Sequence, residues 1–128
     1  MRILLDTHSF LWFSTDDRQL SATAKSVIED PGNDKLLSVA VGWEMAIKVS
    51  LGKLTVTGPI DAILNQALAK THWELLGIEV AHLAAVSTLK FHHKDPFDRL
   101  LIAQSLVEDT PIVSKDPEFD AYGVEREW

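Results

Sequence analysis

Short apolar runs alternate with segments of helical periodicity along almost the whole chain. A short continuous apolar run is typical of a buried strand, whereas apolar residues that recur every three or four positions indicate an amphipathic helix. Strands that alternate with helices predict an α/β fold whose helices cover both faces of the sheet. Strands are expected at 2–6, 35–39, 74–78, 111–114 and 124–128, and helices near 10–13, 20–28, 43–51, 59–68, 80–89 and 95–107.

Length and composition suit one domain. The chain has 128 residues, 46% of them hydrophobic, and no repeat or long linker interrupts it, so we expect a single domain over residues 1–128. The absence of cysteine excludes disulfides, thiolate zinc sites and a cysteine nucleophile. The start meets a charge too early for a signal peptide, and no apolar run reaches membrane-spanning length. These features predict a cytoplasmic protein.

Four acidic residues stand where this pattern would bring them together: Asp6 after the first strand, Glu44 on a helix, Asp98 at a helix start and Asp116 after a late strand. Because the carboxyl ends of parallel strands share one edge of a sheet, these acids are predicted to form one anionic cluster. Crowded carboxylates resist ionising together, and oxygen ligands favour Mg²⁺ or Mn²⁺ as the neutralising cation. The cluster therefore predicts metal-assisted phosphodiester chemistry.

Each acid also has a structural explanation. Asp6, Asp95 and Asp116 all stand directly before an expected helix or turn, where an aspartate serves as the N-cap. Glu44 precedes Lys48 by four residues, the spacing of a surface ion pair worth about 0.3–0.5 kcal/mol. These roles do not exclude a ligand role, since helix starts at the carboxyl edge of a sheet face the same space.

The formal net charge of −7 opposes general attraction to nucleic acid, because phosphate contacts need lysine and arginine. Any RNA contact must then use a local basic patch. His8 and the pair His92 and His93 are assigned at most an auxiliary role in RNA contact, and the tryptophans are expected to anchor the core or an interface. The candidate patch beside Asp98 consists of Lys90, His92, His93, Lys94 and Arg99.

Four segments repeat the order of a known family: Leu4-Leu5-Asp6-Thr7-His8, Trp43 to Lys48 with Leu51 to Leu54, His93 to Gln104, and Ser114-Lys115-Asp116. Together they resemble the PIN-domain ribonucleases, and most of all the VapC-like toxins of bacterial type II toxin-antitoxin systems. The resemblance implies a three-layer α/β/α fold with a mainly parallel sheet. It also implies Mg²⁺- or Mn²⁺-dependent cleavage of RNA.

The same resemblance assigns roles to individual residues. Asp6 and Asp98 would hold the principal metal ion, with Asp116 and Glu44 completing the catalytic pocket, while Ser114 would help to order it. One or two metal ions are both compatible with this set. Asp95 neighbours the matching acid and either shares its work or only caps the helix.

Toxins of this family imply two kinds of protein partner. A cognate antitoxin would place a cationic side chain against Asp6 and Asp98, with hydrophobic anchors near Trp12 and Trp43, and the toxin itself would form a homodimer. Two alternatives to a ribonuclease stay open. One is a receiver-like phosphoacceptor domain, although only a single acid, Asp6, follows the first strand. The other is a PIN-like module that binds RNA or a partner without cutting.

Overall fold

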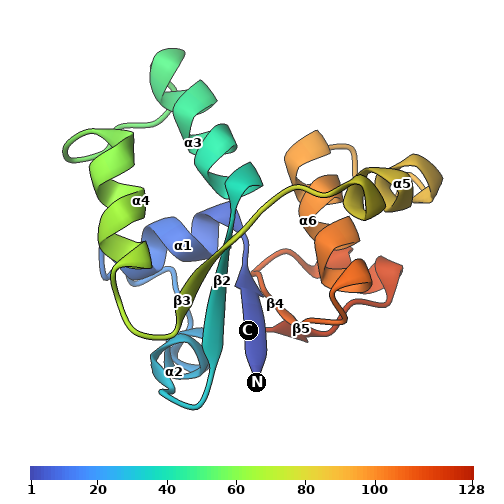
Figure 1. Cartoon of the computed structure of the whole chain (residues 1–128), viewed down its shortest axis with the longest axis horizontal. Helices are drawn as coiled ribbons and strands as arrows, with labels where there is room; N and C mark the ends of the chain where they lie inside the picture. The colour runs from blue at the N-terminus through green and yellow to red at the C-terminus, as the bar shows by residue number, and fades with distance from the viewer.

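The computed structural model describes all 128 residues and confirms the alternation of strands and helices (Figure 1). None of its helices combines the length and the apolar character that a membrane crossing needs. In chain order the elements are β1 (Arg2–Leu5), α1 (Thr7–Ser14), α2 (Ala22–Glu29), β2 (Asp34–Ser38), α3 (Val39–Ser50), α4 (Ile60–Leu68), β3 (Trp73–Leu76), α5 (Val80–Thr88), α6 (Pro96–Val107), β4 (Ile112–Val113), the 3-10 helix η1 (Pro117–Tyr122) and β5 (Arg126–Glu127).

The five strands form one sheet in the order β3-β2-β1-β4-β5. Every neighbouring pair is parallel, so the expected mainly parallel sheet is confirmed and contains no antiparallel pair. The first strand lies at the centre, where Leu4 is in register with Leu36 of β2 and with Ile112 of β4. All strands therefore end at the same edge, which brings residues from both halves of the chain together.

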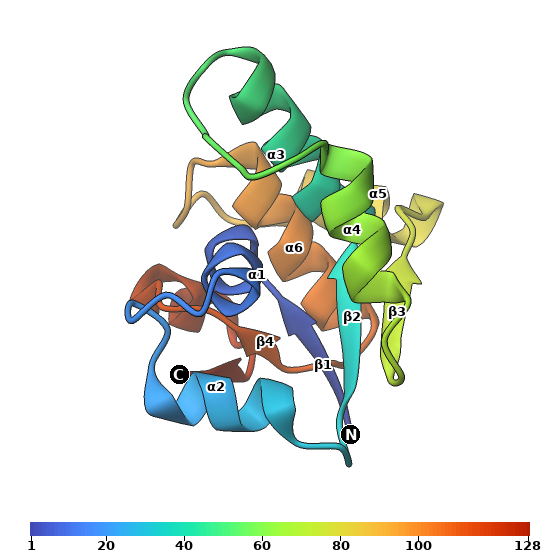
Figure 2. The same ribbon diagram turned by 90° about the vertical axis from the view of Figure 1, so that its left-hand side faces the viewer.

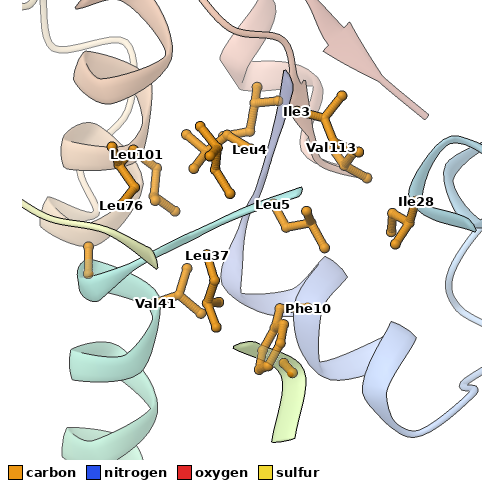
Figure 3. Close-up of a cluster of buried hydrophobic side chains, with 14 of the residues drawn as sticks. Ile3, Leu4, Leu5, Phe10, Ile28, Leu37, Val41, Leu76, Leu101 and Val113 are labelled. Atoms are coloured by element: carbon orange, nitrogen blue, oxygen red, sulfur yellow. The ribbon is translucent and has the colours of Figure 1, made fainter. Parts of the chain in front are cut away.

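Helices cover both faces of this sheet and make the expected three layers. In Figures 1 and 2, α5 and α6 lie on one side, while α1, α2 and α4 lie on the other. Ile3, Leu4 and Leu5 of β1 are each at most 1% exposed, which explains why this strand is apolar at three consecutive positions rather than at alternate ones. Figure 3 shows Leu4 directed toward Leu101 of α6, whereas Leu5 is directed to the opposite side of the strand, where Phe10 lies.

The third strand differs from its expected bounds. It begins one residue earlier than the range 74–78 and ends at Leu76. Trp73, which the apolar pattern alone did not place in the strand, is only 8% exposed, because it packs against Phe10 and Phe13 of α1. The strand lies at the edge of the sheet, which leaves Leu75 57% exposed.

Two further boundaries are set by polar side chains. Val39, expected at the end of a strand, is the first residue of α3, because the Ser38 hydroxyl accepts a hydrogen bond from the backbone N–H of Ala40 at 3.1 Å and starts the helix there. The expected turn after Asp116 is the short helix η1, and the last strand, expected over 124–128, is reduced to two residues.

Candidate active site

The expected acids meet at the carboxyl edge of the sheet. Asp6 directly follows β1, and its backbone N–H donates to the carbonyl of Val113 in β4 at 3.1 Å, so the strand that leads to Asp116 runs alongside. Asp98 lies in the first turn of α6 and Glu44 lies on α3, two helices in contact at this edge. The structure thus brings side chains from four separate segments into one neighbourhood.

Asp6 is both a helix cap and a buried acid. Its Oδ1 accepts a hydrogen bond from the backbone N–H of Ser9 at 2.9 Å, so the N-cap expectation is confirmed. Asp6 also lies close enough to Asp98 for its charge to act on that acid, and only 5% of the residue is exposed. Burial raises the pKa of this carboxyl, because an apolar environment disfavours its charged form.

Asp95 caps α6, whereas the neighbouring acid Asp98 does not. Asp95 Oδ1 accepts hydrogen bonds from the backbone N–H groups of Phe97 at 2.8 Å and Asp98 at 3.1 Å, as expected of the cap of α6. Asp98 makes no such cap contact. Burial raises its pKa to about 7, and the negative charges of Asp95 and Asp6 push it in the same direction.

Glu44 is not the surface residue that its spacing from Lys48 suggested. The predicted pair is present, with Lys48 Nζ 2.6 Å from Glu44 Oε2, but Glu44 itself is only 3% exposed. Its other oxygen accepts a hydrogen bond from the Thr7 hydroxyl at 2.6 Å. The neighbouring Trp43 is 55% exposed and packs edge to face on Phe97, so α3 turns the acid inward and the indole outward.

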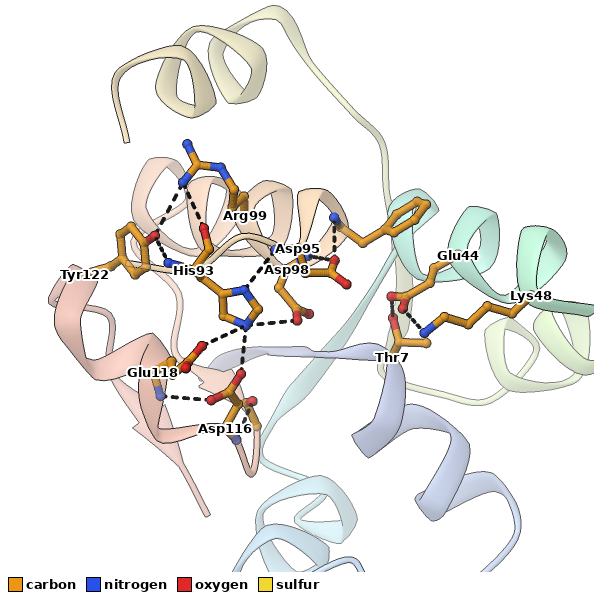
Figure 4. Close-up of polar contacts among 12 residues, drawn as sticks. Thr7, Glu44, Lys48, His93, Asp95, Asp98, Arg99, Asp116, Glu118 and Tyr122 are labelled. Atoms are coloured by element: carbon orange, nitrogen blue, oxygen red, sulfur yellow. Dashed lines mark hydrogen bonds and ion pairs between the residues drawn. The ribbon is translucent and has the colours of Figure 1, made fainter. Parts of the chain in front are cut away.

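Asp116 closes the site on the side of β4 (Figure 4). Its Oδ1 accepts from the backbone N–H of Glu118 at 2.9 Å, which is the expected N-cap contact for η1. Its own backbone N–H donates to the hydroxyl of the fully buried Ser114 at 3.1 Å, so Ser114 holds the turn that carries this acid.

The expected basic patch is exposed at Lys90, His92 and Lys94, but the expectation is wrong for Arg99 and His93. Arg99 is only 6% exposed, and its guanidinium donates to the backbone carbonyls of Leu89 at 3.2 Å and Lys90 at 2.9 Å, so it holds the loop before α6 instead of facing solvent. His93 turns its ring toward the acids, with Nε2 2.8 Å from Asp116 Oδ2. The proximity of His93 to the helix cap at Asp95 was the only sign in the sequence of this placement.

A groove beside the acids is lined by three lysines, Lys48, Lys53 and Lys70. Its volume is about 910 Å³, and it runs between α1, the end of α3, the following loop and α4. Thr7 and Lys48, which both hold Glu44, also line it, so the groove adjoins the acidic site. We call it the lysine groove, and Thr7, His8, Trp12, Lys48, Lys53 and Lys70 are among its lining residues.

The residues of this site fit a divalent cation. Asp6 and Asp98 both have raised pKa values, because burial disfavours their charged forms, and the negative charges of neighbouring acids add to the rise at Asp98. A hard cation held by these acids would offset their negative charges, and their donor atoms are oxygens of the kind that Mg²⁺ and Mn²⁺ prefer. His93, Asp98 and Asp116 also offer atoms that lie within 4.8 Å of one another.

Comparison with known proteins gives consistent results. The family model described as the PIN domain matches residues 3–125. The chain is 32% identical over 116 residues to ribonuclease VapC22 of Mycobacterium tuberculosis, a match that covers 89% of this chain and 86% of that protein.

Solved structures with low sequence identity share the fold. VapBC2 from Rickettsia felis, bound to a DNA fragment from its promoter, superposes with a TM-score of 0.71 at 13% identity, covering 100% of both chains. FitAcB from Neisseria gonorrhoeae gives 0.66 at 17% identity, covering 97% of this chain and 95% of that one. VapBC-1 from nontypeable Haemophilus influenzae gives 0.66 at 14% identity, covering 98% and 96%.

Proposed function

Because the chain belongs to the PIN domain family, we propose that it is a metal-dependent endoribonuclease that acts as the toxin of a type II toxin-antitoxin system in the cytoplasm. Membership of this family removes the basis for the receiver-domain alternative. The observation that supports catalysis most directly is Asp98, an acid whose pKa is raised to about 7 by burial and by the acids around it. We propose that residues 1–128 act as one domain.

Asp6, Asp98, Asp116 and Glu44 are the proposed ligands and catalytic residues. When bound, Mg²⁺ or Mn²⁺ supplies positive charge to offset the scissile phosphate and the means to activate water. The chain's part is to hold the acids in place. Thr7 and Lys48 fix both oxygens of Glu44, while Ser9 fixes one oxygen of Asp6.

The choice of acid is testable with a matched pair of variants. Asp98→Asn should abolish Mn²⁺-dependent cleavage of RNA by the purified protein, whereas Asp95→Asn should preserve it, because asparagine still caps α6. EDTA should stop the wild-type reaction and added Mn²⁺ should restore it. A wild-type rate for Asp98→Asn would show that Asp98 is not a catalytic acid, and unimpaired cleavage in EDTA would refute the metal dependence. Wild-type protein that leaves RNA uncut with Mn²⁺ present would favour a module that binds without cutting.

The lysine groove is the proposed path of the RNA backbone. In a chain with net charge −7, it gathers Lys48, Lys53 and Lys70 beside the acidic site, and phosphate contacts of this kind make affinity depend on salt. Lys53→Glu and Lys70→Glu should each weaken binding to single-stranded RNA and lower its salt dependence. Lys25→Glu is the matched control, because Lys25 lies outside the groove and pairs with Asp16 at 2.9 Å.

We propose a cognate antitoxin as the regulating partner. The acids at Asp6 and Asp98 suit a cationic side chain from such a protein, and Trp12 in the lysine groove suits an apolar anchor. Trp43 is exposed outside the lysine groove and suits either the antitoxin or a second toxin copy in the proposed homodimer. Co-expression with the small open reading frame next to the gene should restore growth and co-purify the product. Failure of both, with an active nuclease, would remove the toxin role and leave the nuclease standing.

A further inference from the structure

His93 is held on several sides in the middle of the candidate site (Figure 4). Its backbone N–H donates to the Tyr122 hydroxyl at 2.7 Å, and its carbonyl accepts from Arg99 Nη1 at 3.3 Å. Its ring packs edge to face on Phe119, with centroids 5.7 Å apart. Only 11% of the side chain is exposed. A residue fixed to this degree keeps one ring orientation toward the acids.

One ring nitrogen of His93 faces a hydrogen-bond donor, and the other faces hydrogen-bond acceptors. The backbone N–H of Asp95 donates to Nδ1 at 3.1 Å, and a backbone amide acts only as a donor. Nδ1 must therefore carry a lone pair, which places the proton of the neutral ring on Nε2. Nε2 in turn lies 2.8 Å from Asp116 Oδ2 and 3.2 Å from Asp98 Oδ2. Glu118 Oε2 lies further away, at 3.6 Å, so the N–H faces three carboxylates, of which Asp116 and Asp98 are the nearest (Figure 4).

This arrangement is the reverse of that in a metal-binding histidine. A histidine that binds a metal through one nitrogen donates its other N–H to a carbonyl or carboxylate. Here the other nitrogen accepts, so a lone pair on Nε2 would require an unfavourable contact between two N–H groups at Nδ1. The distances among His93, Asp98 and Asp116 allow a metal ion, but the hydrogen bond from Asp95 opposes histidine as one of its ligands.

We propose that His93 is a positioning residue, locked by Asp95 as an Nε2–H donor that aims Asp98 and Asp116 at a shared cation without binding the cation itself. This proposal rests on the proposed function of the site. It assigns a purely oxygen ligand set to the metal, the set typical of Mg²⁺ and Mn²⁺.

The tautomer can be observed directly in the intact protein. In two-bond ¹H–¹⁵N correlation spectra of wild-type protein at pH 8, where the free imidazole is neutral, we expect His93 as the Nε2–H form. The same form should persist after saturation with Mg²⁺, which is diamagnetic. The Nδ1–H form, or loss of the Nε2 proton when Mg²⁺ binds, would overturn the proposal by making His93 a ligand.

Two substitutions distinguish the effect of the Nε2–H donor from the effect of the ring's size. Glutamine places an amide N–H near the position of Nε2, whereas asparagine is too short to reach there, so His93→Gln should keep Mn²⁺ affinity close to wild type. His93→Asn should weaken that affinity about 10- to 100-fold in calorimetric titration, as expected when a supporting partner of metal ligands is lost. His92→Gln is the control, because His92 is exposed and packs on Tyr122 away from the acids.

The outcomes distinguish this proposal from the proposed function. Equal Mn²⁺ affinities for His93→Gln, His93→Asn and the wild type would overturn the positioning role, even if the protein cuts RNA. A wild-type protein that binds Mn²⁺ with the expected dependence on His93 but leaves RNA uncut would support the positioning role and refute the nuclease.

Discussion

Asp98 offers the most direct test of the electrostatic reasoning, because it can be neutralised with almost no change in shape. Asparagine at this position keeps an oxygen that can accept from His93, whose Nε2 lies 3.2 Å from the carboxylate. The substitution therefore removes a charge while leaving the nearby contact intact. The metal-free variant should be more stable than the wild type, since burial and the negative charges of Asp95 and Asp6 all disfavour an ionised Asp98.

The size of the effect follows from linkage. The pKa of Asp98 is 3.8 without the fold and about 7 within it. Because the folded pKa is raised, the stability that this group contributes is fully present below pH 3.8 and is lost as the pH rises through about 7. One pKa unit corresponds to about 1.4 kcal/mol, so the loss approaches ~4 kcal/mol above pH 7. From pH 5 to pH 8, the free energy of unfolding of the variant should therefore rise by about 2–3 kcal/mol relative to that of the wild type.

Urea unfolding followed by circular dichroism in EDTA, at intervals from pH 5 to pH 8, measures this gap. Asp61→Asn is the control, because Asp61 also lies in the first turn of a helix but is exposed. Its gap from the wild type should stay constant over the same range. A gap for Asp98→Asn that is equally constant would show that Asp98 is not crowded in the fold, and the main support for the proposed site would be lost.

Further predictions concern the metal, the loop before α6 and its cap. Free Mn²⁺ at a hundred times its dissociation constant should stabilise the fold by ~2.7 kcal/mol, and a melting temperature that stays flat across the titration would count against a metal cluster. Arg99→Leu should lower the free energy of unfolding by about 2–4 kcal/mol, because it removes the charged hydrogen bonds to the carbonyls of Leu89 and Lys90. The exposed Arg18→Leu should change it little in the same urea assay. Asp95→Ala should cost about 1 kcal/mol in that assay and Asp95→Asn much less, since alanine cannot accept from the start of α6; equal losses would refute the capping role.

Local patterns in the sequence were enough to predict most of the fold. The apolar run at residues 3–5 predicted a buried strand, and it is the central strand of the sheet. The caps at Asp6, Asp95 and Asp116 were also predicted, because a cap depends on backbone groups only two or three residues away. The four acids could be placed at one edge for a related reason, since strand direction and chain order determine which loops meet.

The inner or outer orientation of individual side chains was decided by the tertiary structure. Periodicity could not tell which side of the apolar stripe Glu44 occupies, and its burial depends on Thr7 from a different helix. Arg99 was read as a solvent-facing cation, but the carbonyls that bury it come from a loop whose path only packing determines.

His93 shows most clearly which contacts the sequence did not predict. In the sequence it is one of two adjacent histidines beside a lysine, a pattern that indicates a basic surface. Its role depends on Asp116, Phe119 and Tyr122, which lie more than twenty residues further along the chain. A sequence determines short-range hydrogen bonds and the order of its strands, whereas the partners of a side chain at the sheet edge are determined only when distant segments pack against one another.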